Sequence, residues 1–133
     1  MPEINLTAVI LGGLMPLLIG YIWYHPKVFG DILSIINHGE IIKKPHPPLI
    51  YFVTFILSVL ITMLIAAILS THAIEDQTAA HGAFHGLMAS IFMGIPTFAI
   101  IAMFESKSVK YILIHAFYWM ICFALMGFIV GLL

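Results

Sequence analysis

The chain has 133 residues, of which 62% are hydrophobic and only 8% are charged. A soluble domain carries about a quarter of its residues as charged side chains, so this composition excludes an ordinary water-soluble fold and indicates a protein surrounded by membrane lipid. The formal net charge of -1 offers no basic surface to nucleic acid. The single cysteine, Cys122, cannot form an internal disulfide.

The charged residues divide the chain into four long uncharged stretches. Each stretch reaches the roughly 20 residues that a helix needs to cross a hydrocarbon core. Helices are expected because an open sheet edge would leave backbone groups unpaired in lipid. We therefore predict a single all-α domain over residues 1–133, a four-helix transmembrane bundle with spans at about residues 5–24, 49–70, 82–104 and 111–133.

The basic residues predict the orientation of these spans. All of them lie in the first and third connections, which carry Lys27, Lys43, Lys44, Lys107 and Lys110. The second connection carries only acidic charge. Because basic connections stay in the cytoplasm, we expect both termini and the second connection on the non-cytoplasmic side of a multi-pass membrane protein.

The first connection contains a short amphipathic pattern before its proline-rich end. Its apolar residues recur at helical spacing and are Val28, Phe29, Ile32, Leu33 and Ile36. This spacing predicts a short helix lying in the membrane interface and ending near Gly39.

Three segments of the chain resemble the signatures of a known family. They are Gly20-x-x-Trp23-Tyr24-x-Pro26-x-x-Phe29-Gly30, His81-Gly82-x-x-His85-Gly86 and Phe104-Glu105-x-Lys107-Ser108-x-Lys110-Tyr111. In this order they are similar to the motifs of a family of small four-helix bacterial integral membrane proteins of unknown function. Members usually carry a further tryptophan and a longer polar segment after Gly30, and this chain departs from that pattern. The resemblance implies a four-helix domain in a bacterial inner membrane and supplies no activity.

The third span carries small residues at every fourth position. They are Gly82, Gly86, Ser90 and Gly94. Residues spaced by four share one helix face, and small side chains there let a second helix approach closely. We interpret this ladder as a helix-packing face, which serves either within the chain or against a second copy. Just beyond it, Pro96 is expected to kink the span.

Histidines at the outer end of the third span form a candidate metal site. His81 and His85 lie one turn apart, so their imidazoles can share an ion such as Zn²⁺ or Cu²⁺. The preceding connection adds three further candidate ligands, His72, Glu75 and Asp76. The alternative is that both histidines are interfacial polar residues bonded to carbonyls of the connection or to a neighbouring helix.

A second group of polar and aromatic residues is expected at the opposite end of the bundle. In the fourth span, four of them share one helix face, and the end of the first span faces them. The group comprises Trp23, Tyr24, His25, His115, Tyr118, Trp119 and Cys122. Such a cluster either satisfies its own hydrogen bonds across helices or forms a small ligand pocket.

The sequence indicates an accessory protein and not an enzyme. The predicted spans contain no charged residue, and no nucleophile stands beside a base. We expect a structural helical bundle that contacts membrane lipid and associates with itself or with other membrane subunits, without a cofactor. The alternatives are a small oligomeric transporter or channel, motivated by the hydroxyl stripe of Thr54, Ser58 and Thr62, and a metal-binding or redox protein that uses the histidine pair.

Overall fold

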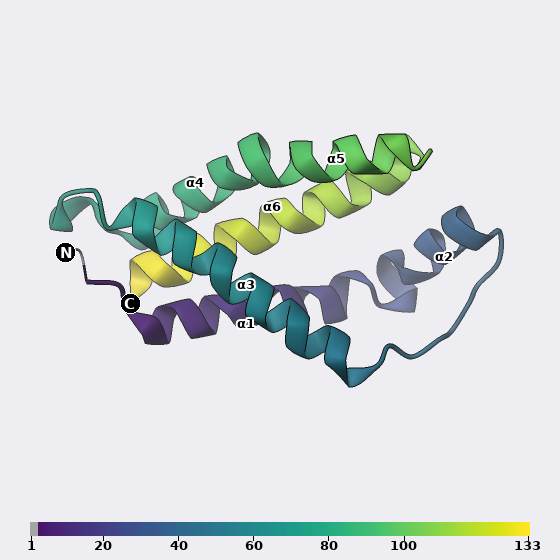
Figure 1. The fold of residues 1–133 in the computed structure, drawn as a ribbon, viewed down its shortest axis with the longest axis horizontal. Coiled ribbons are helices and arrows are strands. Elements are labelled where there is room, and N and C mark those ends of the chain that lie inside the picture. Colours follow the sequence, from purple (N-terminus) through teal and green to yellow (C-terminus); the bar gives the residue numbers. More distant parts are fainter. Residues whose placement is uncertain (1–2) are drawn as a thin grey trace.

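The computed structural model describes residues 3–133, and the regular structure over this range is entirely helical. Its long helices are α1 (Leu6–Trp23), α3 (Pro48–Leu69), the combined α4 (Ala79–Ala89) and α5 (Ile95–Phe104), and α6 (Val109–Leu132) (Figure 1). All four are long and apolar enough to cross a membrane. The prediction of an all-α chain with four such helices is confirmed, and the third helix begins at Ala79 rather than at Gly82.

Polar side chains at the helix starts explain where several of these elements begin. Asn5, Thr78 and Ser108 each accept backbone N–H bonds in the first turn of α1, α4 and α6. These bonds satisfy donors that a helix start leaves free. Pro48 begins α3, where its missing N–H costs nothing.

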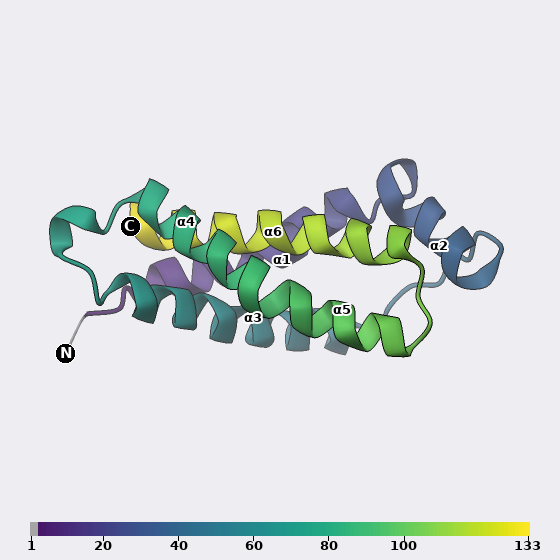
Figure 2. The same ribbon diagram turned by 90° about the horizontal axis from the view of Figure 1, so that it is seen from above.

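Helix α6 lies in the middle of the bundle and packs against α1, α3 and α4 (Figures 1 and 2). The core around it is formed by Ile65, Phe123 and Met126. The start of α1 and the C-terminus lie at the end of the molecule that also holds the connection between α3 and α4, and the other two connections lie at the opposite end (Figure 1).

The third span bends where α4 passes into α5. A π-helical turn covers Ser90–Gly94, in which the N–H of Ile95 donates to the carbonyl of Ser90. Pro96 follows in the first turn of α5. A proline removes one backbone donor, and a wider turn is a common way to accommodate the change. As a result α4 runs along α6, whereas α5 diverges from it (Figure 2). The predicted kink therefore takes the form of a π turn.

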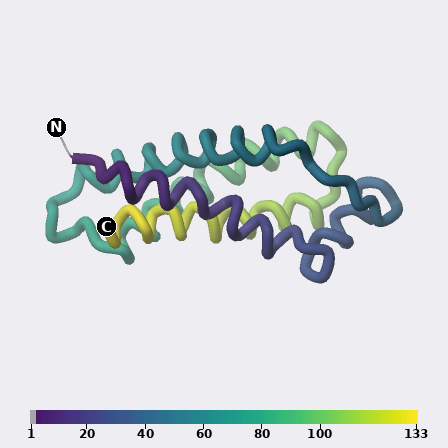
Figure 3. The backbone as a smooth tube through the Cα atoms, turned by 90° about the horizontal axis from the view of Figure 1, so that it is seen from below, coloured from purple at the N-terminus to yellow at the C-terminus, as the bar shows by residue number. Residues whose placement is uncertain are grey.

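The first connection is helical in its first half. A π-helical turn over Pro26–Gly30 leads into α2 (Asp31–His38), which ends at Gly39 with a φ of 74°. That left-handed conformation favours glycine. The chain then runs back to α3 without regular structure (Figure 3). The Nζ of Lys107 lies 3.5 Å from Oδ1 of Asn37, so the first and third connections meet at one end of the bundle.

Candidate functional site

The small-residue ladder brings α4 into backbone contact with α6. A Cβ atom added to Gly82 would overlap the carbonyl of Gly127, and one added to Gly86 would overlap the carbonyl of Phe123. The contact is reciprocal, because a Cβ on Gly127 would overlap the carbonyl of Gly82. In this structure the ladder is occupied within the chain, so this face is not free for a second copy.

The other two members of the ladder lie further along the same side. Ser90 is fully buried, and its hydroxyl has no hydrogen-bond partner among the described residues. Gly94 faces the ring of Phe123, whose nearest atom would lie 3.3 Å from an added Cβ. The distance between the third span and α6 therefore increases along the ladder. The two backbones touch at Gly82, whereas a side chain of α6 fits between them at Gly94.

A similar close approach, which was not predicted from the sequence, joins α1 to α3. A Cβ on Gly12 would overlap the side chain of Thr62, and one on Gly13 would overlap that of Val59. The adjacent glycines in an otherwise apolar span were the available signal. The hydroxyl of Thr62 donates to the carbonyl of Ser58 at 2.8 Å, so the hydroxyl stripe of α3 is packed against α1 in this region.

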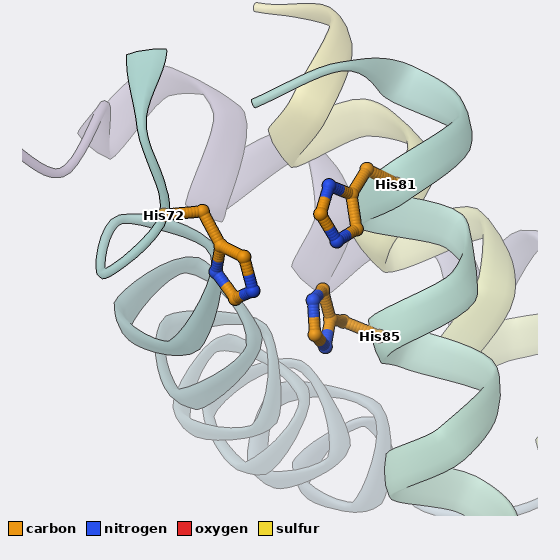
Figure 4. Close-up of side chains that lie close together, drawn as sticks. All are labelled: His72, His81 and His85. Carbon is orange, nitrogen blue, oxygen red and sulfur yellow. The ribbon is translucent and has the colours of Figure 1, made fainter. Parts of the chain in front are cut away.

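Three histidines converge at the end of the bundle where α1 begins and α6 ends. His72 follows α3, while His81 and His85 stand one turn apart on α4. One nitrogen of each ring lies within 4.8 Å of the corresponding nitrogens of the other two. Figure 4 shows the three rings turned toward one another around a common space. The ring centroids are 4.6–4.7 Å apart.

Backbone carbonyls orient two of these rings. Nδ1 of His81 lies 2.8 Å from the carbonyl oxygen of Asp76, and Nδ1 of His72 lies 3.2 Å from that of Ile68. A carbonyl only accepts, so each Nδ1 carries the proton and donates, which leaves Nε2 with its lone pair. Nε2 of His85 is buried and has no partner among the described residues.

The two acidic candidates lie outside this group. The side chains of Glu75 and Asp76 are exposed, and neither carboxylate joins the converging nitrogens. Asp76 contributes through its backbone carbonyl alone. Their charge still lies in the connection next to the three imidazoles and favours a cation there.

The polar and aromatic residues at the opposite end are satisfied by bonds between helices. The hydroxyl of Tyr24 lies 2.6 Å from Nδ1 of His115, and the hydroxyl of Tyr118 donates to the carbonyl of Pro16 at 2.5 Å. The indole of Trp23 donates to the carbonyl of Ile114 at 3.2 Å. These bonds tie α1 to α6, and Cys122 is buried in α6 one turn beyond Tyr118.

Two residues of the predicted group lie outside it or at its edge. His25 is exposed, and its Nδ1 accepts a bond from the N–H of Lys27, so it caps the turn that follows α1. Trp119 packs edge to face on Tyr118 and on Phe123, and it lines a groove between α3, α5 and α6. The aromatic residues of α6 therefore lie on two sides of the helix, toward α1 and toward the groove. The spacing of these residues along α6 did not reveal this.

Comparison with known proteins gives one match. The model of a family described as "Protein of unknown function (DUF1761)" matches residues 7–131. No curated protein matches the chain significantly. No solved structure does so either.

Proposed function

Since the chain belongs to the DUF1761 family of unknown function, we propose from its own geometry that it is an accessory helical bundle of the bacterial inner membrane. In this role it takes up a further transmembrane helix, from a second copy or from another subunit, and carries out no catalysis.

An open apolar groove on the α3 side of α5 supports this proposal. The groove has a volume of about 760 Å³ and is lined by side chains of α3, α4, α5 and α6 and by Met93 and Gly94 of the π turn. Thr97 is the one polar residue in its lining, and its hydroxyl donates to the carbonyl of Met93. Helices in lipid associate through complementary shape and not through hydrophobic drive. A hollow of this kind offers a second helix more contact than a flat lipid-facing side would.

The groove exists because α5 diverges while α4 stays on α6. The ladder glycines fix α4 against α6, and the π turn at Ser90–Gly94 then redirects the chain. Since Gly82 and Gly86 of the ladder already contact the backbone of α6, association has to use another surface, and the groove, which includes Gly94, offers a receptive shape.

The proposed orientation places both termini and the histidine end outside the cytoplasm. Four of the five lysines lie in the two connections at the other end, where Lys107 meets Asn37, and Lys110 lies in the first turn of α6 at the same end. Helix α2 also lies at that end, with Ile35 half exposed and Leu33 buried (Figure 1). This amphipathic character supports a position in the interface.

Cysteine labelling in intact cells tests the orientation. In a Cys122→Ala background, a membrane-impermeant thiol reagent should label Glu75→Cys from outside and should spare Lys43→Cys and Lys107→Cys until the cells are opened. Labelling of the two lysine positions from opposite sides would contradict the proposed arrangement.

Photo-crosslinking in native membranes tests the association. A photoreactive amino acid is placed at Met93, which lines the groove and is 59% exposed, and at Leu18 on α1, which is 55% exposed and lies outside it. We expect protein crosslinks from position 93 and lipid adducts from position 18. A crosslink to the same chain identifies a homo-oligomer, and one to a different protein identifies a subunit. Lipid adducts alone from both positions refute the proposal.

A further inference from the structure

We propose that His72, His81 and His85 form a binding site for a divalent transition-metal ion of the Zn²⁺ or Cu²⁺ type. Neither the accessory role nor the groove requires this site, which lies where α3 gives way to α4.

The distances between the nitrogens suit a shared ion. Ions of this class hold imidazole nitrogens at about 2.0–2.1 Å, which in tetrahedral geometry sets neighbouring nitrogens about 3.3 Å apart. The three candidate nitrogens lie within 4.8 Å of one another. Small side-chain rotations therefore bring all three onto one ion without moving the helices.

The protonation pattern also suits a metal. His72 and His81 each use Nδ1 to donate to a backbone carbonyl. This is the usual arrangement of a metal-ligating histidine, in which the outer nitrogen bonds a carbonyl and fixes the ring so that the other nitrogen faces the ion. A purely interfacial role explains these Nδ1 bonds, but it leaves the buried Nε2 of His85 without a partner among the described residues.

His85 supplies the strongest of these observations. Its Nε2 is buried and has no hydrogen-bond partner among the described residues. Burying a polar atom without a partner costs free energy, and coordination of an ion by that nitrogen removes the cost. In Figure 4 the ring of His85 faces those of His72 and His81 across the common space.

The ligand set selects the class of ion. Imidazole suits Zn²⁺ and Cu²⁺, whereas Mg²⁺ and Ca²⁺ require oxygen ligands. Three protein ligands leave a fourth position for water or an external ligand. The bound ion would also link the end of α3 to α4, because His72 comes from one side of the connection and His81 and His85 come from the other.

Metal binding by the full-length protein in detergent tests the site. The protein is purified with a tag that contains no histidine, stripped with a chelator and titrated with Zn²⁺. We expect one Zn²⁺ per chain by elemental analysis and a rise in melting temperature, since a ligand of the folded state stabilises it. Mg²⁺ should leave the melting temperature unchanged. Co²⁺ in place of Zn²⁺ should give the visible absorption bands of a tetrahedral site.

Substitutions distinguish this site from adventitious binding. His85→Gln and His81→Gln should each weaken Zn²⁺ binding at least tenfold, whereas His38→Gln, at an exposed histidine of the first connection, should bind as the wild type does. His85→Leu removes the unpartnered nitrogen, so the metal-free variant should melt no lower than the metal-free wild type while losing the rise with Zn²⁺. A wild-type protein that takes up no Zn²⁺, or variants at positions 81 and 85 that take up as much as His38→Gln, overturns the proposal.

Discussion

One added methyl group at Gly82 tests how α4 is held against α6. The Cβ of Gly82→Ala would lie on the carbonyl group of Gly127. Both partners are backbone, so no side-chain rotation relieves the overlap and the two helices have to separate. That separation weakens the dispersion contacts along the whole interface, because these contacts depend steeply on distance.

Gly94→Ala provides the reference for the magnitude. Both substitutions replace a helical glycine by alanine, which by itself favours the helix by about 1 kcal/mol. The new Cβ at Gly94 would meet the ring of Phe123 at 3.3 Å, and a ring can shift by a few tenths of an ångström. Overpacking costs about 1–3 kcal/mol in a closely packed interior. We expect Gly82→Ala to be less stable than Gly94→Ala by about 2 kcal/mol.

Reversible unfolding by SDS in mixed micelles, followed by circular dichroism, measures the difference. The double variant Gly82→Ala/Gly127→Ala should lose less stability than the sum of its single variants, since one separation of the helices relieves both overlaps. Equal stability of Gly82→Ala and Gly94→Ala would refute the account of the α4–α6 contact.

Two further predictions concern single contacts. Tyr118→Phe removes the buried bond to the Pro16 carbonyl and should lower the free energy of unfolding by about 1 kcal/mol in the same SDS assay. The control Tyr21→Phe, at an 80% exposed position, should have no effect. An equal effect at both positions would contradict the role of this bond. Gly39→Ala forces a residue with a side chain into a left-handed conformation at a cost of about 1 kcal/mol. Amide hydrogen exchange should therefore become faster in α2 and stay unchanged in α3. Unchanged exchange in α2 would argue against this account of the helix end.

The number and character of the long helices could be predicted from the sequence because lipid imposes a local rule. A span needs a long uncharged stretch, and the charged residues from Lys27 to Lys110 mark where each stretch ends. The short helix that ends at Gly39 followed from equally local signals. None of these features depends on which helix lies beside which.

The partners of each helix face depended on the tertiary structure. The ladder at Gly82 and Gly86 had two possible partners in the sequence, and the fold places it on α6 of the same chain. His72 became an equal member of the histidine group because the turn after α3 folds back toward α4, whereas the nearby carboxylates are exposed and lie outside the group.

At the other end of the bundle and along α5, the partners of each helix face also depended on the tertiary structure. His25 lies outside the polar cluster because it caps the turn after α1, and Trp119 lies at the edge of the cluster, where it contacts Tyr118 and lines the groove. The groove beside α5 arises from a π turn whose direction depends on the contact of α4 with α6. Sequence period determines which residues share a helix face, and only the packing of separate helices determines what that face meets.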